Sequence, residues 1–450
     1  MKKIIILSIF LLVALSSYAT AAFNPTLITT YQDVAPADSI EGARGMQVDA
    51  TRKIAYISAT TDDSLTAINF SNSSSFSVYG SVNDAAPIGS VDGIWFGTLD
   101  SNNIFYAPSG TDSTTAWYNV TAGTFVFMND TAADTAGAGS QQGENDVAIV
   151  NTATKKWLIT GGLTDDTVSS FDVTNPWVRP AVTNSFNDAS GACSVDGMYD
   201  MYNIPGTTYF LAAATVDSYI TLLNVSDAGA IACIGSGYTD TADAGSIEGI
   251  QYMYYDTAAG YVYTTSPTDG YLTILTDVAG GTPTLVGSVG GMTTPVSVSN
   301  VYTTGSEKYV FVGSSTAAQN ITIINVTDPA NPAILSVFSE TSGTCVYNGV
   351  YSLFVDGDYL YASSGVDGCF YSISLFSVDT CTCPGSGNNW EINMADSCSI
   401  VDTCNLGAGN ITFIGTGTTT FNAAISSKNL EYPVTDQTLF IGSNTIITVG

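Results

Sequence analysis

The chain has 450 residues, with 40 acidic against 10 basic side chains and a formal net charge of −30. This acidic excess argues against nucleic acids and anionic membranes as partners, because both would repel a negative surface. Histidine is absent, which excludes serine–histidine and cysteine–histidine catalysis and removes the commonest transition-metal ligand.

Residues 1–22 have the pattern of a secretory signal peptide. Lys2 and Lys3 form a basic start, 4–15 is a short apolar run, and small residues at 19–21 offer a cleavage site. The run is too short for a membrane-spanning helix, and no later stretch reaches the ~18 apolar residues that one needs. We therefore expect a secreted or cell-surface protein with no transmembrane segment after signal removal.

The chain from residue 23 to about 380 repeats one phrase about every 52 residues. Each unit has a leading residue, usually acidic, then an apolar strand, a Tyr/Phe-rich strand, an Asp-containing turn and two further strands. β-Branched and aromatic residues between turn signals favour strands over helices. Seven four-stranded units predict a seven-bladed β-propeller. The leading positions are Glu41, Asp92, Glu144, Asp196, Glu248, Thr294 and Asn348.

The two ends of this region indicate how the ring closes. The seventh unit has only three strands before Cys381, whereas residues 24–31 form a strand-like segment that belongs to no unit. That segment resembles the fourth-strand phrases at 282–286 and 331–335. We therefore expect the first strand to complete the last blade, which would remove two open sheet edges. The alternative architecture is an open solenoid.

The sixth unit carries the most distinctive phrase, ITIINVTDPANP, from Ile321 to Pro332. This phrase resembles the LVIVD-repeat motif of bacterial and archaeal extracellular β-propellers, and the resemblance covers about residues 24–380. It implies a surface or secreted propeller and no particular reaction.

Residues 381–450 differ from the repeats and begin with a turn-rich, Cys-containing linker at 381–387. The phrase at 411–415 returns at 438–442, 27 residues later, which suggests coils of a β-solenoid. The alternative is a small cystine-stapled β-cap. Because the sequence stops within a strand-like run, we expect either further coils or pairing of this strand with another subunit.

Eight cysteines in an exported chain predict disulfides. We expect Cys345 to pair with Cys369 in the seventh blade and Cys193 with Cys233 in the fourth. The remaining four form two bridges of open connectivity, or a zinc site as the alternative: Cys381, Cys383, Cys398 and Cys404.

The acidic leading residues should ring one mouth of the central channel, and the turn aspartates should form a wider ring on the same face. Oxygen-rich rings suit calcium, which accepts six to eight oxygen ligands. The alternative is structural, because aspartate in turns bonds its own backbone. The predicted cation-binding residues, with Ca²⁺ as the only candidate cofactor, are Glu41, Asp92, Glu144, Asp196 and Glu248.

The Asn-X-Ser/Thr pattern marks candidate glycosylation sites in an exported protein. The alternative is that asparagine simply supplies turn chemistry at a repeated position. The eight candidates are Asn69, Asn72, Asn119, Asn129, Asn224, Asn320, Asn325 and Asn410.

These features favour a non-catalytic secreted or cell-surface propeller that mediates adhesion, envelope assembly or protein and filament contacts. Its expected partners are surface proteins or further copies of itself, with carbohydrate as a further candidate. The tyrosines of the strands are expected in the core; the alternative for Tyr252, Tyr254 and Tyr255 is a sugar-stacking patch. The alternative is a calcium-dependent hydrolase or carbohydrate-acting propeller that uses carboxylates at the channel mouth, since paired carboxylates hydrolyse glycosides without histidine.

Overall fold

The computed structural model describes residues 23–32, 40–83, 91–121, 124–131, 143–164, 166–187, 193–239, 247–276, 282–316, 320–339, 345–376, 381, 383–394, 398–414, 417–431, 437–442 and 446–449. The predicted signal peptide lies outside these residues. Every element named within them is a strand, which confirms the all-β prediction. The described part of the chain holds no helix that is long and apolar enough to cross a membrane. The strands fall into two compact units.

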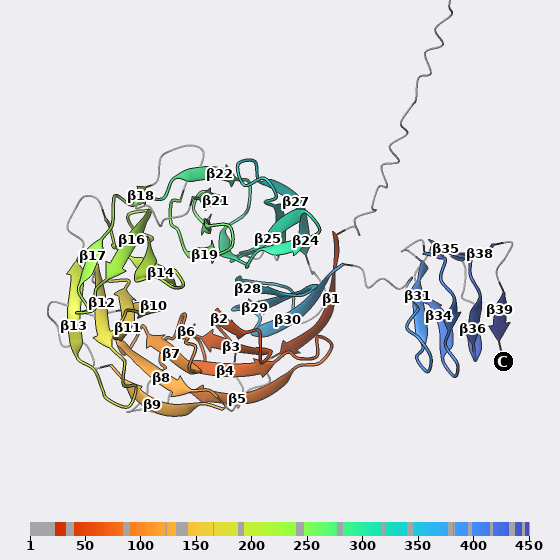
Figure 1. The fold of residues 1–450 in the computed structure, drawn as a ribbon, viewed down its shortest axis with the longest axis horizontal. Helices are drawn as coiled ribbons and strands as arrows, with labels where there is room; N and C mark the ends of the chain where they lie inside the picture. The colour runs from red at the N-terminus through yellow and green to blue at the C-terminus, as the bar shows by residue number, and fades with distance from the viewer. Residues whose placement is uncertain are drawn as a thin grey trace, which may run out of the picture. The chain divides into compact units, whose positions relative to one another are not determined.

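The larger unit is the predicted propeller, in which the described residues form seven antiparallel sheets around a central channel (Figure 1). Blade 1 contains β2 (Ala43–Asp49), β3 (Ile54–Ala59), β4 (Ser64–Asn69) and β5 (Ser77–Asn83). Blade 2 contains β6 (Thr98–Leu99), β7 (Ile104–Ser109), β8 (Thr114–Asn119) and β9 (Val126–Asp130). Blade 3 contains β10 (Glu144–Asn151), β11 (Lys156–Gly162), β12 (Thr167–Asp172) and β13 (Val182–Asn187).

Blades 4 and 6 each carry one additional short strand. Blade 4 contains β14 (Met198–Asn203), β15 (Tyr209–Ala214), β16 (Tyr219–Val225), β17 (Ile231–Cys233) and β18 (Tyr238–Thr239). Blade 5 contains β19 (Tyr252–Asp256), β20 (Tyr261–Ser266), β21 (Tyr271–Leu275) and β22 (Leu285–Val289). Blade 6 contains β23 (Pro295–Val298), β24 (Tyr302–Thr304), β25 (Glu307–Ser314), β26 (Asn320–Asn325) and β27 (Ala333–Ser339).

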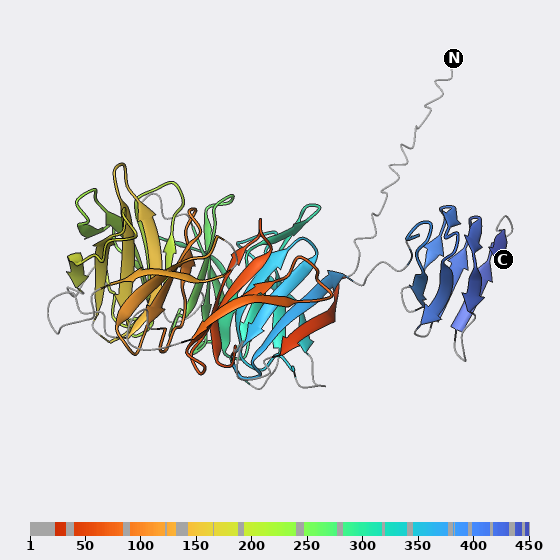
Figure 2. The same ribbon diagram turned by 90° about the horizontal axis from the view of Figure 1, so that it is seen from below.

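The seventh blade closes the ring as the sequence predicts. It combines β28 (Val350–Asp356), β29 (Tyr359–Ser364) and β30 (Cys369–Phe376) with the N-terminal strand β1 (Phe23–Gln32). Strand β1 pairs with β30, and Figure 2 shows this red strand beside the blue strands of the last blade. Tyr361 and Phe370 of blade 7 share a buried cluster with Ile57 and Ile68 of blade 1, so the last blade packs on the first.

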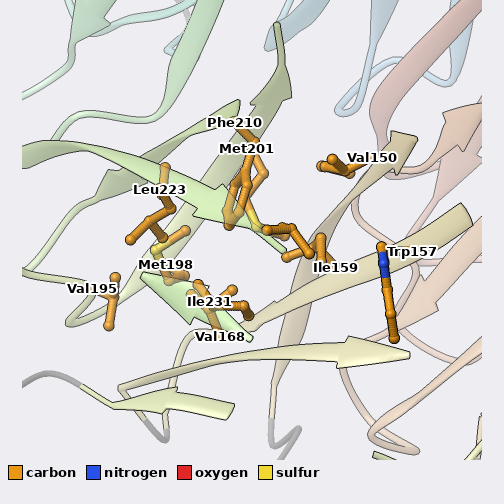
Figure 3. Packing of buried hydrophobic residues seen from close by; sticks show 13 residues of the cluster. Val150, Trp157, Ile159, Val168, Val195, Met198, Met201, Phe210, Leu223 and Ile231 are labelled. Carbon is orange, nitrogen blue, oxygen red and sulfur yellow. The ribbon is translucent and has the colours of Figure 1, made fainter. Parts of the chain in front are cut away.

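Each blade is held to the next by a layer of buried apolar side chains. Figure 3 shows the layer between blades 3 and 4, where Trp157 and Ile159 of β11 belong to one cluster with Met198, Met201 and Phe210. Trp157 and Phe210 have no solvent exposure. Apolar, often β-branched or aromatic side chains lie on both faces of the middle strands, so these strands are buried along nearly their whole length as the blades stack face to face.

A glycine in left-handed conformation leads the chain into the innermost strand of most blades. Gly42 has φ 78°, and a Cβ at this position would lie 2.3 Å from Thr61 Oγ1. Both the positive φ and the close approach require glycine here. Equivalent positive-φ residues are Gly93, Gly143, Gly197, Gly249, Thr294 and Gly349, and they give a more reliable register between blades than the leading acids.

The smaller unit is a solenoid of three coils with three parallel sheets. The first coil contains β31 (Trp390–Asn393), β32 (Ser399–Ile400) and β33 (Cys404–Asn405); the second contains β34 (Asn410–Ile414), β35 (Gly417–Phe421) and β36 (Ile425–Ser427). The third contains β37 (Asn429–Glu431), β38 (Gln437–Ile441) and β39 (Ile447–Val449). The solenoid prediction is confirmed over the cap alternative.

The predicted 27-residue period of the solenoid is wrong. Ile411 on β34 pairs with Leu430 on β37, whereas Phe440 on β38 pairs with Thr420 on β35, so one coil takes about 20 residues. The two similar phrases at 411–415 and 438–442 belong to different sides of the solenoid. They look alike because every side alternates small or Thr residues with apolar residues.

All eight cysteines form disulfides. The predicted pairs Cys193–Cys233 and Cys345–Cys369 are confirmed. In the tail, the bridges are Cys381–Cys398 and Cys383–Cys404, so the cluster is not a zinc site. Cys381 and Cys383 also pack against the apolar interior of the solenoid, and the two bridges therefore tie the linker to its first coil.

Candidate functional site in the central channel

The leading acids do not form one uniform ring. Gly143, not Glu144, is the structural equivalent of Gly42, so Glu144 occupies the first strand position, where blade 1 has Ala43. Its side chain is fully buried and accepts a hydrogen bond from Thr115 Oγ1 at 2.5 Å. The placement of Glu144 at the channel mouth was therefore wrong, because the sequences were aligned on acidic residues and not on the left-handed glycine.

The other four predicted acids do lie directly before the positive-φ glycine. Glu41 and Glu248 are exposed, whereas Asp92 and Asp196 are half-buried. Burial, together with the neighbouring Asp63 carboxylate, raises the pKa of Asp92. Among the described residues, no group of three or more acids or cysteines is arranged to hold a metal ion. Calcium binding by these acids stays a prediction.

The turn aspartates on this face already serve the backbone. Asp63 accepts a hydrogen bond from Gly93 N at 2.9 Å, and Asp269 accepts one from Glu248 N at 3.1 Å. Asp367 accepts bonds from the amides of Val346 and Asn348, both at 3.0 Å. This recurrence fits the structural interpretation of the outer ring, in which each aspartate fixes the turn that leads into the innermost strand.

The channel holds a cavity of about 430 Å³, within the usual size range of small-molecule sites. Innermost strands of all seven blades contribute to its wall, and none of the five predicted acids does. The cavity runs toward the ends of these strands, where Asn151, Asn203, Asn300 and Phe354 line it. It therefore lies toward the side of the ring opposite the leading acids.

Aromatic side chains cross the channel between the leading acids and the cavity. Tyr252 of blade 5 donates its hydroxyl to the carbonyl of Arg44 in blade 1 at 2.6 Å. Phe96 packs edge-on against Tyr252, with ring centroids 5.0 Å apart, and Tyr199 lies 5.9 Å from Phe96. These three rings are buried and form one cluster, which we call the aromatic plug.

Arg44 lies next to the plug between two aromatic rings. Its guanidinium carbon is 4.0 Å from the centroid of Tyr351 and 4.9 Å from that of Trp95. Such stacking stabilises a cation without a carboxylate partner.

Beside the plug, two carboxyl groups from neighbouring blades meet. Asp146 of β10 accepts a hydrogen bond from Met201 N at 2.7 Å, and Asp200 of β14 accepts one from Met253 N at 2.5 Å. The two carboxyls also hydrogen-bond each other. Burial raises the pKa of Asp200 to about 6, and burial plus the Asp200 charge raises that of Asp146 well above its usual range.

The sequence contained a signal for this pair that alignment on the leading acids obscured. In the register set by the left-handed glycine, Asp146 and Asp200 are equivalent to Gly45, Ser297 and Ser352 of other blades. Only two adjacent blades place a carboxyl at this inward position. In a scaffold of similar blades, a residue type that only one or two blades carry at a shared position indicates a functional site.

The proposed tyrosine patch does not form. Tyr252 belongs to the aromatic plug, and Tyr255 is buried in the core between blades 4 and 5. Of these three tyrosines, Tyr252 and Tyr254 line the cavity and Tyr255 does not, because neighbouring residues of a strand face opposite sides. A sugar-stacking surface built from all three tyrosines is therefore wrong.

The candidate glycosylation sites follow the repeat. Asn69, Asn119 and Asn325 each end a third strand and accept a hydrogen bond from the backbone amide two residues later, at 2.7, 2.9 and 2.9 Å. Asp172 does the same for Thr174 N in blade 3, which explains why Asn or Asp recurs there. Glycosylation stays a prediction, and the intact mass of the native protein would measure it.

No model of a protein family matches the chain, and no curated protein matches it. Solved structures do match. A protein from Lactobacillus plantarum shares 15% identity at a TM-score of 0.50, covering 67% of this chain and 86% of that chain. The WD40 β-propeller domain of Doa1 shares 10% sequence identity at a TM-score of 0.52, covering 78% of this chain and 97% of that chain.

Virginiamycin B lyase from Staphylococcus aureus shares 8% identity at a TM-score of 0.54, covering 78% of this chain and 100% of that chain. At such identities these likenesses show the fold alone, a seven-bladed β-propeller. The resemblance to the LVIVD-repeat family stays a prediction.

Proposed function

We propose that this chain is a secreted or cell-surface propeller that is not an enzyme and that makes protein–protein contacts. In these contacts, a strand of the partner molecule pairs with β27, the outer strand of blade 6. The observation that carries the proposal is the exposure of β27. Residues 333–337 are all exposed, and they include Ile334, Leu335 and Val337 at 38%, 50% and 53%. The four disulfides fit the oxidising compartment that such a role requires.

Strand β27 lacks the features that usually protect an edge strand. Its sequence, AILSVFS, holds no charged residue and no proline, and it is the last strand of its sheet. An uncharged apolar edge readily pairs with a strand from another molecule. The expected occupant is β27 of a second copy. Copies with a net charge of −30 repel each other over most of their surface, and β27 offers an uncharged place where they can meet about a two-fold axis.

Sedimentation velocity of the purified protein tests this proposal. We expect a concentration-dependent dimer that Val337→Lys converts to a monomer, because a lysine on each of two paired edges would repel the other. Val126→Lys is the matched control, since Val126 begins the outer strand of blade 2 with 55% exposure, and this variant should still dimerise. A monomeric wild type, or equal dimerisation of all three proteins, would contradict strand addition on β27.

The carboxyl pair supports binding over hydrolysis. Glycoside hydrolases separate their two carboxyl groups by about 5–10 Å, whereas Asp146 and Asp200 are in hydrogen-bond contact and each accepts a backbone amide of the next blade. A calcium-dependent hydrolase therefore has less support than a contact protein. Dependence of the contacts on cations stays a prediction, and melting curves with calcium and with chelator would measure it.

A further inference from the structure

The channel cavity has a strongly uneven chemistry. Among the described residues, three aspartates line it, Asp100, Asp146 and Asp200, and no lysine or arginine does. Asp100 is neutralised by Lys156, whose Nζ lies 2.5 Å from its Oδ2. The Asp146–Asp200 pair has no such partner within ion-pair distance in the part of the chain that the structure describes. The carboxyl pair therefore gives the cavity wall a negative character that no described ion pair neutralises.

A second acceptor at the wall lacks a donor. Asn203, two residues after Met201 on β14, lines the same cavity, and its buried Oδ1 has no hydrogen-bond partner among the residues that the structure describes. By contrast, the amide of Asn300 exchanges hydrogen bonds with the Val355 backbone. A buried acceptor without a partner costs free energy, and a ligand that donates hydrogen bonds would recover it.

Aromatic rings form the remaining walls. Tyr202 and Tyr254 meet edge-on with centroids 6.3 Å apart, and Phe96, Tyr252 and Phe354 also line the cavity. Faces of aromatic rings attract cations, and the attraction is larger where water is excluded. Charge, hydrogen-bonding capacity and aromatic walls thus favour the same type of ligand.

We propose that the channel cavity binds a small organic cation through an ammonium group that contacts the Asp146–Asp200 pair and donates to Asn203 Oδ1. Tyr202, Tyr254 and Phe96 surround its carbon atoms. This proposal goes beyond strand addition on β27 and does not depend on it, because the cavity and β27 lie at opposite ends of a blade.

Calorimetric titration of the full chain with putrescine tests the proposal, with butane-1,4-diol as the neutral ligand of equal carbon length. We expect putrescine to bind and the diol to bind at least tenfold more weakly. The double variant D146N/D200N removes the charge but keeps both oxygen acceptors for the Met201 and Met253 amides. It should bind putrescine at least tenfold more weakly than the wild type.

Asp172→Asn is the matched control, because it removes one acidic charge at the surface pair with Lys155 and should leave putrescine binding unchanged. If the double variant does not fold, Tyr254→Leu removes an aromatic wall and should weaken binding severalfold. Equal binding of the diol would assign the cavity to polyols. Equal weakening by Asp172→Asn would assign putrescine to the general acidic surface. Either result, or the absence of binding heat, overturns the proposal.

Discussion

Replacing Lys156 by methionine should destabilise the propeller by about 3–5 kcal/mol, the usual cost of removing one partner of a buried ion pair. Lys156 of blade 3 holds Asp100 of blade 2, and their side chains are 15% and 2% exposed. Methionine fills the space of the aliphatic part but leaves the carboxylate buried without its cation. Chemical denaturation at neutral pH measures the free energy of unfolding.

The adjacent residue provides the control. Lys155 pairs with Asp172 at 2.6 Å, but these side chains are 40% and 33% exposed, so Lys155→Met should cost less than about 1 kcal/mol. Asp100 also accepts the amides of Asn102 and Ile104 at 2.8 and 2.9 Å. If Lys156→Met costs no more than Lys155→Met, these two amide bonds suffice to hold the carboxylate, and the ion pair between the blades is not important for stability.

The double variant D146N/D200N should raise the free energy of unfolding of the propeller at pH 8. Removing the Asp200 carboxyl alone should contribute about 3 kcal/mol, because each unit by which folding raises a pKa is worth about 1.4 kcal/mol. Burial raises the pKa of Asp200 to about 6, above the ordinary value of 3.8. A group whose pKa is raised by folding favours the folded state at low pH, and this contribution is lost as the pH rises through the folded-state pKa. Asparagine does not ionise, so the double variant does not lose this stability as the pH rises.

Melting temperatures measured from pH 4 to pH 8 check this prediction. The wild type should melt at lower temperature as the pH rises through about 6, and the double variant should show a smaller slope. Asp200 hydrogen-bonds Asp146 of the neighbouring blade, and its charge acts on Tyr199, Tyr202 and Tyr252. Arg44 acts on Tyr199 and Tyr252.

Asp172→Asn is the control of opposite sign, because the hydrogen bonds from Lys155 and Thr174 outweigh the effect of burial and lower the pKa of Asp172. This variant should be slightly less stable than the wild type at pH 8. Equal pH slopes for the wild type and D146N/D200N would show that the pair is not protonated in the folded protein.

The propeller could be predicted from sequence because its information is local and repeated. Each blade restates the same strand and turn chemistry, and the strand at 24–31 was recognisable as the fourth strand missing from blade 7. Cys345 and Cys369 could be paired because both belong to one blade. By contrast, four closely spaced cysteines allow three connectivities, and only the coiling of the solenoid selects Cys381–Cys398 and Cys383–Cys404.

The candidate site was harder to predict because it departs from the repeat. Alignment on acidic residues shifts blade 3 by two positions, which places Glu144 at the mouth and hides the equivalence of Asp146 and Asp200. The backbone conformation of Gly143 fixes the correct register, and conformation cannot be read from residue type alone. The proximity of Asp146 and Asp200 further depends on the packing of β10 against β14, which no property of a single repeat reveals.

The pairing of β1 with β30 has a consequence for how the chain folds as it is synthesised. The first strand of the ring emerges before its partner, and more than 330 residues separate Gln32 from Cys369. Such a distant contact must overcome a large loop-closure entropy, so we expect it to form late. Until then the incomplete ring exposes two sheet edges, and a chaperone that shields β1 during that interval would raise the yield of native protein.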